Sequence, residues 1–342
     1  MTRSSSLALV VALVVVSTGA MLGCRSKSHS QGQAGPAQEP ATQPFTLVLN
    51  WLPEPEFGGF YAAQATGAFA KEGLAVTIKA GGPGVPSLQM VATGQADAGI
   101  TGADEMLLAR IRGADVVPIF AVYQHSPQAL MTREERGVKT LAEVFAGGTV
   151  AMEPGLPYAL FLKAKYGFAK VKVVPYDGGI ARLLLEGDYA QQCYLTSEPL
   201  AAARAGTKTR VFPISDEGYD PYGAVVVVRR EVFEKEPARV ASFVRAAQAG
   251  WALYLAAPEA ANSAMHKLNR AMDLETFDAA AAAQRALVAT PETKAHGLGS
   301  MSRSRWKELA ETLKGLGLGA DLAPGPTWPI YWKSSFFARR IG

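Results

Sequence analysis

The chain alternates short runs of branched apolar residues with longer stretches in which apolar residues recur every three or four positions. The first pattern is typical of strands and the second of amphipathic helices. We therefore expect strands at 45–49, 74–78, 97–100, 116–122, 149–152, 171–175, 189–194 and 223–228. We expect helices between them at 58–71, 85–93, 104–112, 141–145, 158–166, 180–186 and 198–205. After Arg229 the pattern predicts consecutive helices, including a long amphipathic one at 238–256 behind Pro237.

Strands that alternate with helices predict an α/β fold, in which mostly parallel sheets are covered by helices on both faces. Two segments of equal length also indicate an internal repeat: residues 94–105 read GQADAGITGADE and residues 187–198 read GDYAQQCYLTSE. Each passes from a helix-ending glycine through a short strand into a polar turn that begins another helix. Because ligands of such folds bind beyond the carboxyl ends of the strands, we expect the two polar turns to face one cleft.

The amino-terminal residues carry the features of a bacterial lipoprotein signal. Arg3 precedes an apolar segment at 7–16, and the run AMLGCR at 20–25 places a small residue before Cys24. A membrane-spanning anchor is the alternative, but the run is short of the ~20 apolar residues that a spanning helix needs. We expect residues 1–23 to be a signal peptide, Cys24 to be lipidated outside the cytoplasm, and the polar residues 24–44 to be a flexible tether.

Composition and motifs argue against several classes of function. The 34 Lys and Arg residues nearly balance the 30 Asp and Glu residues, so no basic field for nucleic acid is expected. Beyond Cys24 only Cys193 remains, which we expect to be a buried small side chain without a disulfide. The histidines show no metal-ligand spacing, and neither a GxSxG nor a phosphate-loop motif is present. We therefore expect no enzyme, no cofactor and no metal site.

Several motifs together carry a resemblance to a known family. The run LNWLP at 49–53 leads through YAA at 61–63 to GAFAKEGL at 67–74, and GQADAG at 94–99 and TSEP at 196–199 follow. From about residue 45 to 260 the chain resembles the thiamine-pyrimidine, aliphatic-sulfonate and nitrate group of substrate-binding proteins of ABC importers.

The resemblance implies a two-lobed periplasmic-binding-protein fold of type II with a helical C-terminal extension. It implies a first lobe from 45–132 plus 227–342 and a second lobe from 133–226, which close on a ligand and present it to a membrane permease. A monomer is expected. Two alternatives stay open: a tethered sensor that reports to a membrane kinase, and a small-molecule enzyme of the same fold.

The expected ligand is a small, flat, amine-bearing heterocycle such as a thiamine-precursor pyrimidine. Aromatic side chains would stack on its ring, and carboxylates would accept its N–H groups but repel a sulfonate, taurine or nitrate, which is the alternative ligand class. The candidate ligand-binding residues are Trp51, Glu54, Glu56, Tyr61, Thr101, Asp104, Gln124, Glu153, Tyr158, Asp177, Thr196, Glu198 and Tyr222.

Each candidate also has a purely structural interpretation. Trp51 could fill the core at the end of its strand, and any one of the acids could cap a helix or lie in a solvated turn. Asp177 could belong to an ordinary turn before the next helix. Tyr222 could pack at the hinge, and the aromatic segment at 327–332 could pack against the first lobe or dock on the permease.

Overall fold

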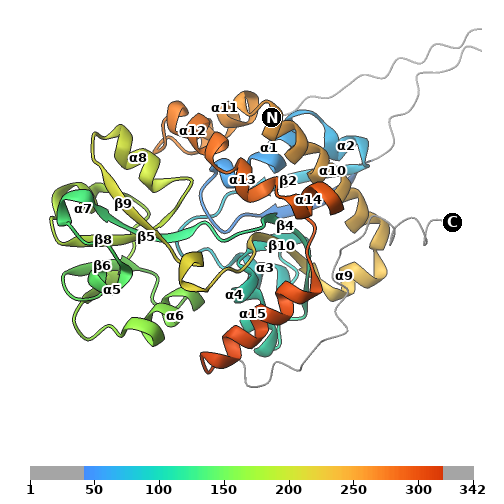
Figure 1. The fold of residues 1–342 in the computed structure, drawn as a ribbon. Coiled ribbons are helices and arrows are strands. Elements are labelled where there is room, and N and C mark those ends of the chain that lie inside the picture. The colour runs from blue at the N-terminus through green and yellow to red at the C-terminus, as the bar shows by residue number, and fades with distance from the viewer. Residues whose placement is uncertain (1–41, 319–342) are drawn as a thin grey trace, which may run out of the picture. The chain divides into compact units, whose positions relative to one another are not determined.

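The computed structural model describes residues 42–318, so Cys24 with its surrounding signal, most of the expected tether and the segment at 327–332 lie outside the described residues. Two five-stranded sheets organise the described part (Figure 1). The first sheet has the order β2-β1-β3-β10-β4. Its strands are β1 (Gln43–Val48), β2 (Leu74–Lys79), β3 (Ala98–Thr101), β4 (Val116–Tyr123) and β10 (Gly223–Arg229).

The second sheet has the order β7-β6-β8-β5-β9. Its strands are β5 (Gln128–Arg133), β6 (Thr149–Met152), β7 (Lys172–Pro175), β8 (Tyr189–Tyr194) and β9 (Thr209–Pro213). In each sheet three neighbouring strands are parallel and the remaining two pairings are antiparallel. The α/β fold is confirmed, and the sheets are mixed where mostly parallel ones were expected.

Helices cover both sheets. With the first sheet lie α1 (Gly58–Ala65), α2 (Ala68–Lys71), α3 (Ser87–Ala92), α4 (Ala103–Ile111), α9 (Arg230–Lys235), α10 (Pro237–Ala256), α11 (Glu259–Leu268), α12 (Leu274–Ala283), α13 (Arg285–Val288), α14 (Pro291–His296) and α15 (Arg303–Gly315). With the second lie α5 (Leu141–Val144), α6 (Pro157–Tyr166), α7 (Ala181–Leu185) and α8 (Glu198–Arg204). The 3₁₀ turns are η1 (Pro55–Phe57), η2 (Glu134–Arg136) and η3 (Ser215–Glu217). None of the helices within 42–318 is long and apolar enough to span a membrane.

We use "first lobe" and "second lobe" for each sheet together with these helices. The strands divide between the lobes differently from the expected boundaries at 132/133 and 226/227. β5 pairs with β8 and β9 in the second sheet, and β10 begins at Gly223 and pairs with β3 and β4 in the first. The chain therefore passes between the sheets at 124–127 and at 214–222. The expected boundary at 132/133 falls at the end of β5, because β5 was not anticipated as a strand. The boundary at 226/227 falls inside β10, although a strand was expected at 223–228.

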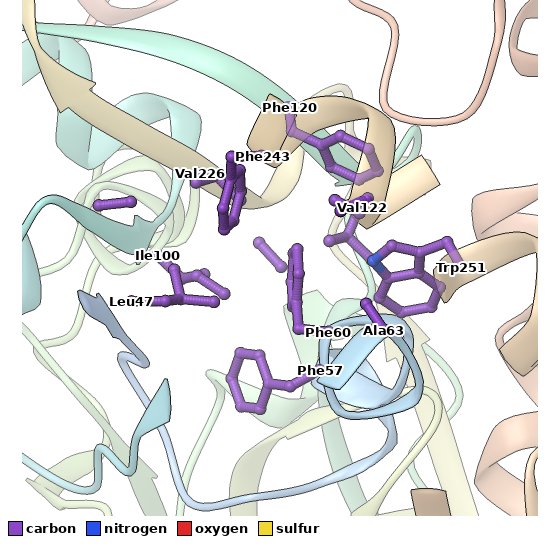
Figure 2. Close-up of a cluster of buried hydrophobic side chains, with 14 of the residues drawn as sticks. Leu47, Phe57, Phe60, Ala63, Ile100, Phe120, Val122, Val226, Phe243 and Trp251 are labelled. Atoms are coloured by element: carbon purple, nitrogen blue, oxygen red, sulfur yellow. The ribbon is translucent and has the colours of Figure 1, made fainter. Parts of the chain in front are cut away.

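The main core of the first lobe lies between its sheet and the helices α1 and α10. Figure 2 shows Phe60 of α1 and Trp251 of α10 directed into the same apolar cluster as Leu47 and Ile100 of the sheet. The rings of Phe60 and Trp251 meet edge to face, with centroids 5.9 Å apart. Gly250 permits this close helix contact, because a Cβ there would lie 2.1 Å from the carbonyl oxygen of Gly59. This packing fixes the start of α1 and, with it, the loop that precedes the helix.

Candidate functional site

A cavity of about 490 Å³ lies between the two sheets. Most of its wall comes from the carboxyl ends of β1, β2, β3, β6, β7 and β8 and the segments that follow them, and these six are the strands in parallel pairs. This is the edge at which α/β folds bind ligands, because helix N-termini and loops converge there. The two turns of the internal repeat, after β3 and after β8, both line this cavity as the sequence predicts.

The segment after β1 supplies Asn50, Trp51, Glu54 and Glu56 to the cavity. Pro55 begins the 3₁₀ turn η1, and its carbonyl oxygen accepts a 2.9 Å hydrogen bond from Nε2 of Gln284. Gln284 in turn accepts a hydrogen bond from the Tyr123 hydroxyl, so the C-terminal helices hold this loop against β4. Glu56 is buried and accepts no hydrogen bond from the described residues. The loop therefore holds two glutamates at the cavity wall.

The turn between β3 and α4 supplies Thr101, Asp104 and Glu105. Oε2 of Glu105 accepts hydrogen bonds from Gly102 N at 2.8 Å and from the Thr101 hydroxyl at 3.2 Å, which caps the helix. Oδ2 of Asp104 accepts a 2.6 Å hydrogen bond from the hydroxyl of Tyr219, a residue in the crossing that leads back to β10. Asp104 thus connects the first lobe to that crossing.

The turn between β6 and α6 supplies Glu153 and Tyr158 from the second lobe. The backbone N–H of Glu153 donates to Oε1 of Gln192 at 2.8 Å, and Nε2 of Gln192 donates to Oε2 of Glu153 at 2.9 Å. The hydroxyl of Tyr158 also donates to Oε1 of Gln192. This network fixes Glu153 against β8 and leaves its Oε1 without a hydrogen bond from the described residues.

The N-terminus of α8 supplies Ser197 and Glu198. Oε1 of Glu198 accepts from the Tyr176 hydroxyl at 2.6 Å, and its Oε2 accepts from Tyr194 N at 2.8 Å. Across the cleft, the Ser197 hydroxyl donates to Oε2 of Glu54 at 3.1 Å. The start of α8 therefore contacts the loop after β1 on the opposite lobe.

Six carboxyl groups line the cavity, and the exposed Arg112 is the cationic side chain in its wall. Burial, then the charge of Glu198, raises the pKa of Glu54 to about 8. Burial, followed by the charges of Glu54 and Glu198, raises the pKa of Glu56 well above its ordinary value. Burial and the neighbouring Asp104 raise the pKa of Glu105 to about 7. These groups lack a cationic partner, so hydrogen-bond donors of a bound molecule would stabilise their charged forms.

Two amide side chains in the wall also carry a buried polar atom with no partner. These atoms are Oδ1 of Asn50 and Nε2 of Gln128. A buried amide atom without a hydrogen bond is costly, so each points to a bound group that would satisfy it. One offers an acceptor and the other a donor, which matches a ligand with both kinds of group.

Nine of the thirteen predicted site residues line the cavity, and their contact with a ligand stays a prediction: Trp51, Glu54, Glu56, Thr101, Asp104, Glu153, Tyr158, Glu198 and Tyr222. The other four lie elsewhere. Tyr61 is in the hydrophobic core of the first lobe, since α1 turns that face inward. Gln124 is buried and donates to the carbonyl oxygen of Ser300 at 3.0 Å. Asp177 is exposed and accepts from Gly179 N, and Thr196 is buried beside Tyr123.

Other lining residues were not among the predicted ones. They include Asn50, Glu105, Gln128, Tyr176, Gln192, Tyr194, Ser197 and Tyr219. The sequence could have indicated Glu105, because it ends the first copy of the repeat as the candidate Glu198 ends the second. Gln192 and Tyr194 lie within or at the end of a strand, where the sequence does not show which face meets the cleft. Cys193 is buried as expected, without a disulfide, and it also contributes to the cavity wall.

Within the described residues, no group of three or more His, Cys, Asp or Glu side chains is arranged to hold a metal ion. The glutamates instead receive hydrogen bonds from hydroxyl and backbone N–H groups. The cleft is therefore lined by acidic and aromatic side chains, and its carboxylates can accept hydrogen bonds.

Comparisons with known proteins show the family of this chain. The model of the family described as NMT1/THI5 like matches residues 54–261. The chain belongs to this family. The riboflavin-binding protein RibY of Chloroflexus aurantiacus is 24% identical over 76% of this chain and 76% of its own length. The formylaminopyrimidine-binding protein of Halalkalibacterium halodurans is 24% identical over 66% of this chain and 70% of its own length.

Solved structures show the same fold. The periplasmic aliphatic sulphonate binding protein SsuA of Escherichia coli has a TM-score of 0.62 and 16% identity, and the match covers 81% of this chain and 89% of that one. The periplasmic nitrate-binding protein NrtA of Synechocystis PCC 6803 has a TM-score of 0.51 and 12% identity, with 72% and 71% of the two chains covered. This member of the NMT1/THI5 like family thus has the fold of substrate-binding components of ABC importers. The expected periplasmic-binding-protein fold is confirmed.

Proposed function

We propose that this protein is the extracytoplasmic solute-binding component of an ABC importer and that it captures a small, flat, amine-bearing heterocycle of the thiamine-precursor pyrimidine type. The observation that carries the proposal is the composition of the cleft, which combines aromatic rings with six carboxyl groups and has its cationic side chain, Arg112, in an exposed position. A ring with exocyclic amines offers a flat face to the aromatic residues and N–H donors to the carboxylates.

The same carboxyl groups disfavour a sulfonate or nitrate, because each one that is ionised repels an anion and each one that is protonated offers it no positive charge. Two like unit charges 4 Å apart repel by about 4 kcal/mol at an effective dielectric constant of 20, against the roughly 8 kcal/mol of a micromolar complex. The relatives' names point the same way, because a formylaminopyrimidine contains an aminopyrimidine ring and riboflavin contains a fused pyrimidine ring. Structural similarity to the sulphonate and nitrate proteins concerns the fold alone, at 16% and 12% identity.

The glutamates also suggest how a ligand would close the clamp. The Ser197 hydroxyl, beside Glu198 of the second lobe, donates to Glu54 of the first, and the charge of Glu198 raises the pKa of Glu54 across the cleft. A ligand that donates hydrogen bonds to both would remove this repulsion and hold the lobes together. Closure would then be favoured only with a donor-bearing molecule in place, which is the condition under which an importer should accept the protein.

Lipid attachment at Cys24 would keep the protein beside its permease, with residues 24–44 as the tether. We infer a monomer that acts as a carrier and not as an enzyme. Neighbouring genes distinguish the importer from a tethered sensor: genes for a permease and an ATPase favour the importer, and a gene for a membrane histidine kinase favours the sensor.

Isothermal titration of the purified full chain tests the ligand class. We expect 4-amino-5-hydroxymethyl-2-methylpyrimidine to bind at micromolar concentration and taurine and nitrate to give no heat. Glu198→Gln should weaken the pyrimidine complex, while Asp177→Asn, a matched change of an acid outside the cavity wall, should leave it unaltered. Micromolar binding of taurine or nitrate with no heat from the pyrimidine would overturn the ligand assignment.

A further inference from the structure

The carboxyl groups of the cleft fall into two groups. Glu54, Glu56 and Glu198 form the first pole: Ser197, the neighbour of Glu198, donates a 3.1 Å hydrogen bond to Glu54, and the charges of Glu54 and Glu198 both act on Glu56. Asp104, Glu105 and Glu153 form the second pole, in which the charges of Asp104 and Glu153 both act on Glu105. The half-buried Tyr194 at the end of β8 lies within range of both, since Glu56, Glu105 and Asp104 all act on its hydroxyl.

The two poles offer different surroundings to a ligand. At the first pole, Trp51 and Tyr176 present nearly parallel rings on opposite lobes, which suits a flat ring. At the second pole the neighbours are hydroxyl groups and an amide, namely those of Thr101, Tyr158, Gln192 and Tyr219. These groups suit a flexible chain that carries hydroxyl or amine groups, because each can accept or donate a hydrogen bond.

Acceptor capacity remains unused at the second pole. Glu105 uses Oε2 to cap α4 and Glu153 uses Oε2 to hold Gln192, while Oε1 of each accepts no hydrogen bond from the described residues. The two carboxyls come from opposite lobes, so closing the cleft brings like charges toward each other. A single pyrimidine ring held at the first pole would leave this repulsion uncompensated.

The size of the cavity agrees with a longer ligand. A volume of about 490 Å³ falls within the range of pockets that enclose drug-sized molecules, roughly 300–1,000 Å³. Its wall extends from Trp51 and Tyr176 to Leu108, Ala109 and Arg112 on α4. A one-ring ligand would occupy only the first of these ends.

We propose that the natural ligand has two parts, a flat amine-bearing ring held at the first pole and a hydroxyl- or amine-bearing tail that donates hydrogen bonds to Glu105 and Glu153. This inference rests on the proposed function and specifies its substrate class. Glu105 and Glu153 are then specificity-determining residues, because they distinguish a tailed ring from the same ring without a tail.

Matched pairs of probes test the tail. Riboflavin and lumiflavin share one ring system and differ in the polyol, and cytidine and 1-methylcytosine share an amine-bearing pyrimidine and differ in the ribose. Titration of the purified full chain should show that, in each pair that binds, the tailed member binds at least 10-fold more tightly. In Glu105→Gln and in Glu153→Gln that ratio should fall toward one, because an amide N–H₂ replaces an accepting oxygen. In Glu198→Gln both members should weaken and the ratio should persist.

The outcomes separate the two proposals. Equal affinity within every binding pair, or tight binding of lumiflavin or 1-methylcytosine with the tailed partner unbound, overturns the tail and leaves the proposed function standing. If both Glu105→Gln and Glu153→Gln still bind the tailed probe more tightly than the tail-less one, the tail does not bind at the second pole. Absence of binding by every ring probe overturns the proposed function and this inference with it. Thermal denaturation of each variant confirms that it is folded.

Discussion

The indole of Trp51 and the phenol ring of Tyr176 lie nearly parallel across the cleft, with an interplanar angle of 8° and centroids 6.4 Å apart. Trp51 follows β1 of the first sheet and Tyr176 follows β7 of the second, so the pair joins the two lobes. Trp51 also contacts apolar residues of both lobes. The two rings can therefore contact a ligand ring, and their separation changes when the cleft closes.

Replacing Trp51 by alanine should weaken the binding of a flat ring by about 1–3 kcal/mol, which is the value of one ring stacked on an aromatic side chain. Trp51→Phe should recover most of the affinity, because a smaller ring keeps the stacking face. Titration calorimetry with the preferred ring probe measures both. If Trp51→Ala binds the ring as tightly as the parent chain does, Trp51 packs in the core and does not stack on the ligand.

The buried glutamates should make the stability of the ligand-free protein fall as pH rises. Glu54 has an ordinary pKa of 4.5 that burial and Glu198 raise to about 8. Between these two values the folded state holds a proton that the unfolded state has lost, so the free energy of unfolding decreases with pH through this window. Urea denaturation between pH 5 and 8 should show this slope, and Glu54→Gln should reduce it.

Asp177→Asn serves as the control for that experiment, because it removes an exposed acid that does not line the cavity. The slope should stay as in the parent chain. Stability that increases steadily from pH 5 to pH 8 in the parent chain would contradict the assignment of protonated glutamates to the cleft.

Asp220 should be essential to the two crossings between the lobes. Its Oδ1 accepts a 2.7 Å hydrogen bond from Ser126 N, and its Oδ2 lies 2.7 Å from Nδ1 of His125, so it ties the second crossing to the first. Arg305 of α15 adds a 3.0 Å hydrogen bond to the carbonyl oxygen of Asp220. Asp220→Ala leaves the Ser126 N–H without its partner, and we expect a loss of about 1–3 kcal/mol in the free energy of unfolding.

Chemical denaturation measures this loss, and Asp216→Ala in the preceding 3₁₀ turn η3 is a suitable comparison because no hydrogen bond joins Asp216 to the first crossing. Equal stability of the two variants would show that the Asp220 contacts add nothing to the fold.

The sequence predicted the parts of the fold in which local pattern and tertiary position coincide. All eight expected strands correspond to strands of the two sheets, because each is an apolar run bounded by turn residues. β5 and β9 were missed. β5 reads QALMTR, with three apolar residues at its centre, and β9 reads TRVFP, with only Val211 and Phe212 before its final proline. Both are specified by antiparallel pairing with each other, across more than 70 positions of chain, which no local pattern shows.

The candidate site was predictable where a residue follows a strand that ends at the cleft. The sequence did not show which of two adjacent residues faces the cleft, as the segment after β7 illustrates. Tyr176 lines the cavity and the adjacent Asp177 is exposed, because successive side chains of an extended segment point to opposite sides. Gln124 was misplaced because it directly follows β4, yet its side chain donates to the carbonyl oxygen of Ser300, a residue far away in sequence.

An ion-pair group at the surface should act as a latch between the lobes. Arg204 at the end of α8 lies 3.0 Å from Oδ1 of Asp273, which caps α12, and it also contacts Glu275. α8 begins at Glu198 in the cavity, so one short helix connects the ligand site to this group. Because the pairs are exposed, Arg204→Ala should weaken ligand binding only slightly.

Arg182→Ala is the matched control, since Arg182 pairs with Glu186 inside the second lobe and its side chain is 40% exposed against 38% for Arg204. Titration at low ionic strength should show weaker ligand binding in Arg204→Ala and parent-like binding in Arg182→Ala. In high salt the difference should shrink, because screening weakens exposed ion pairs in the parent chain as well. Equal affinities of the two variants at low salt would mean that the Arg204 pairs do not contribute to closure.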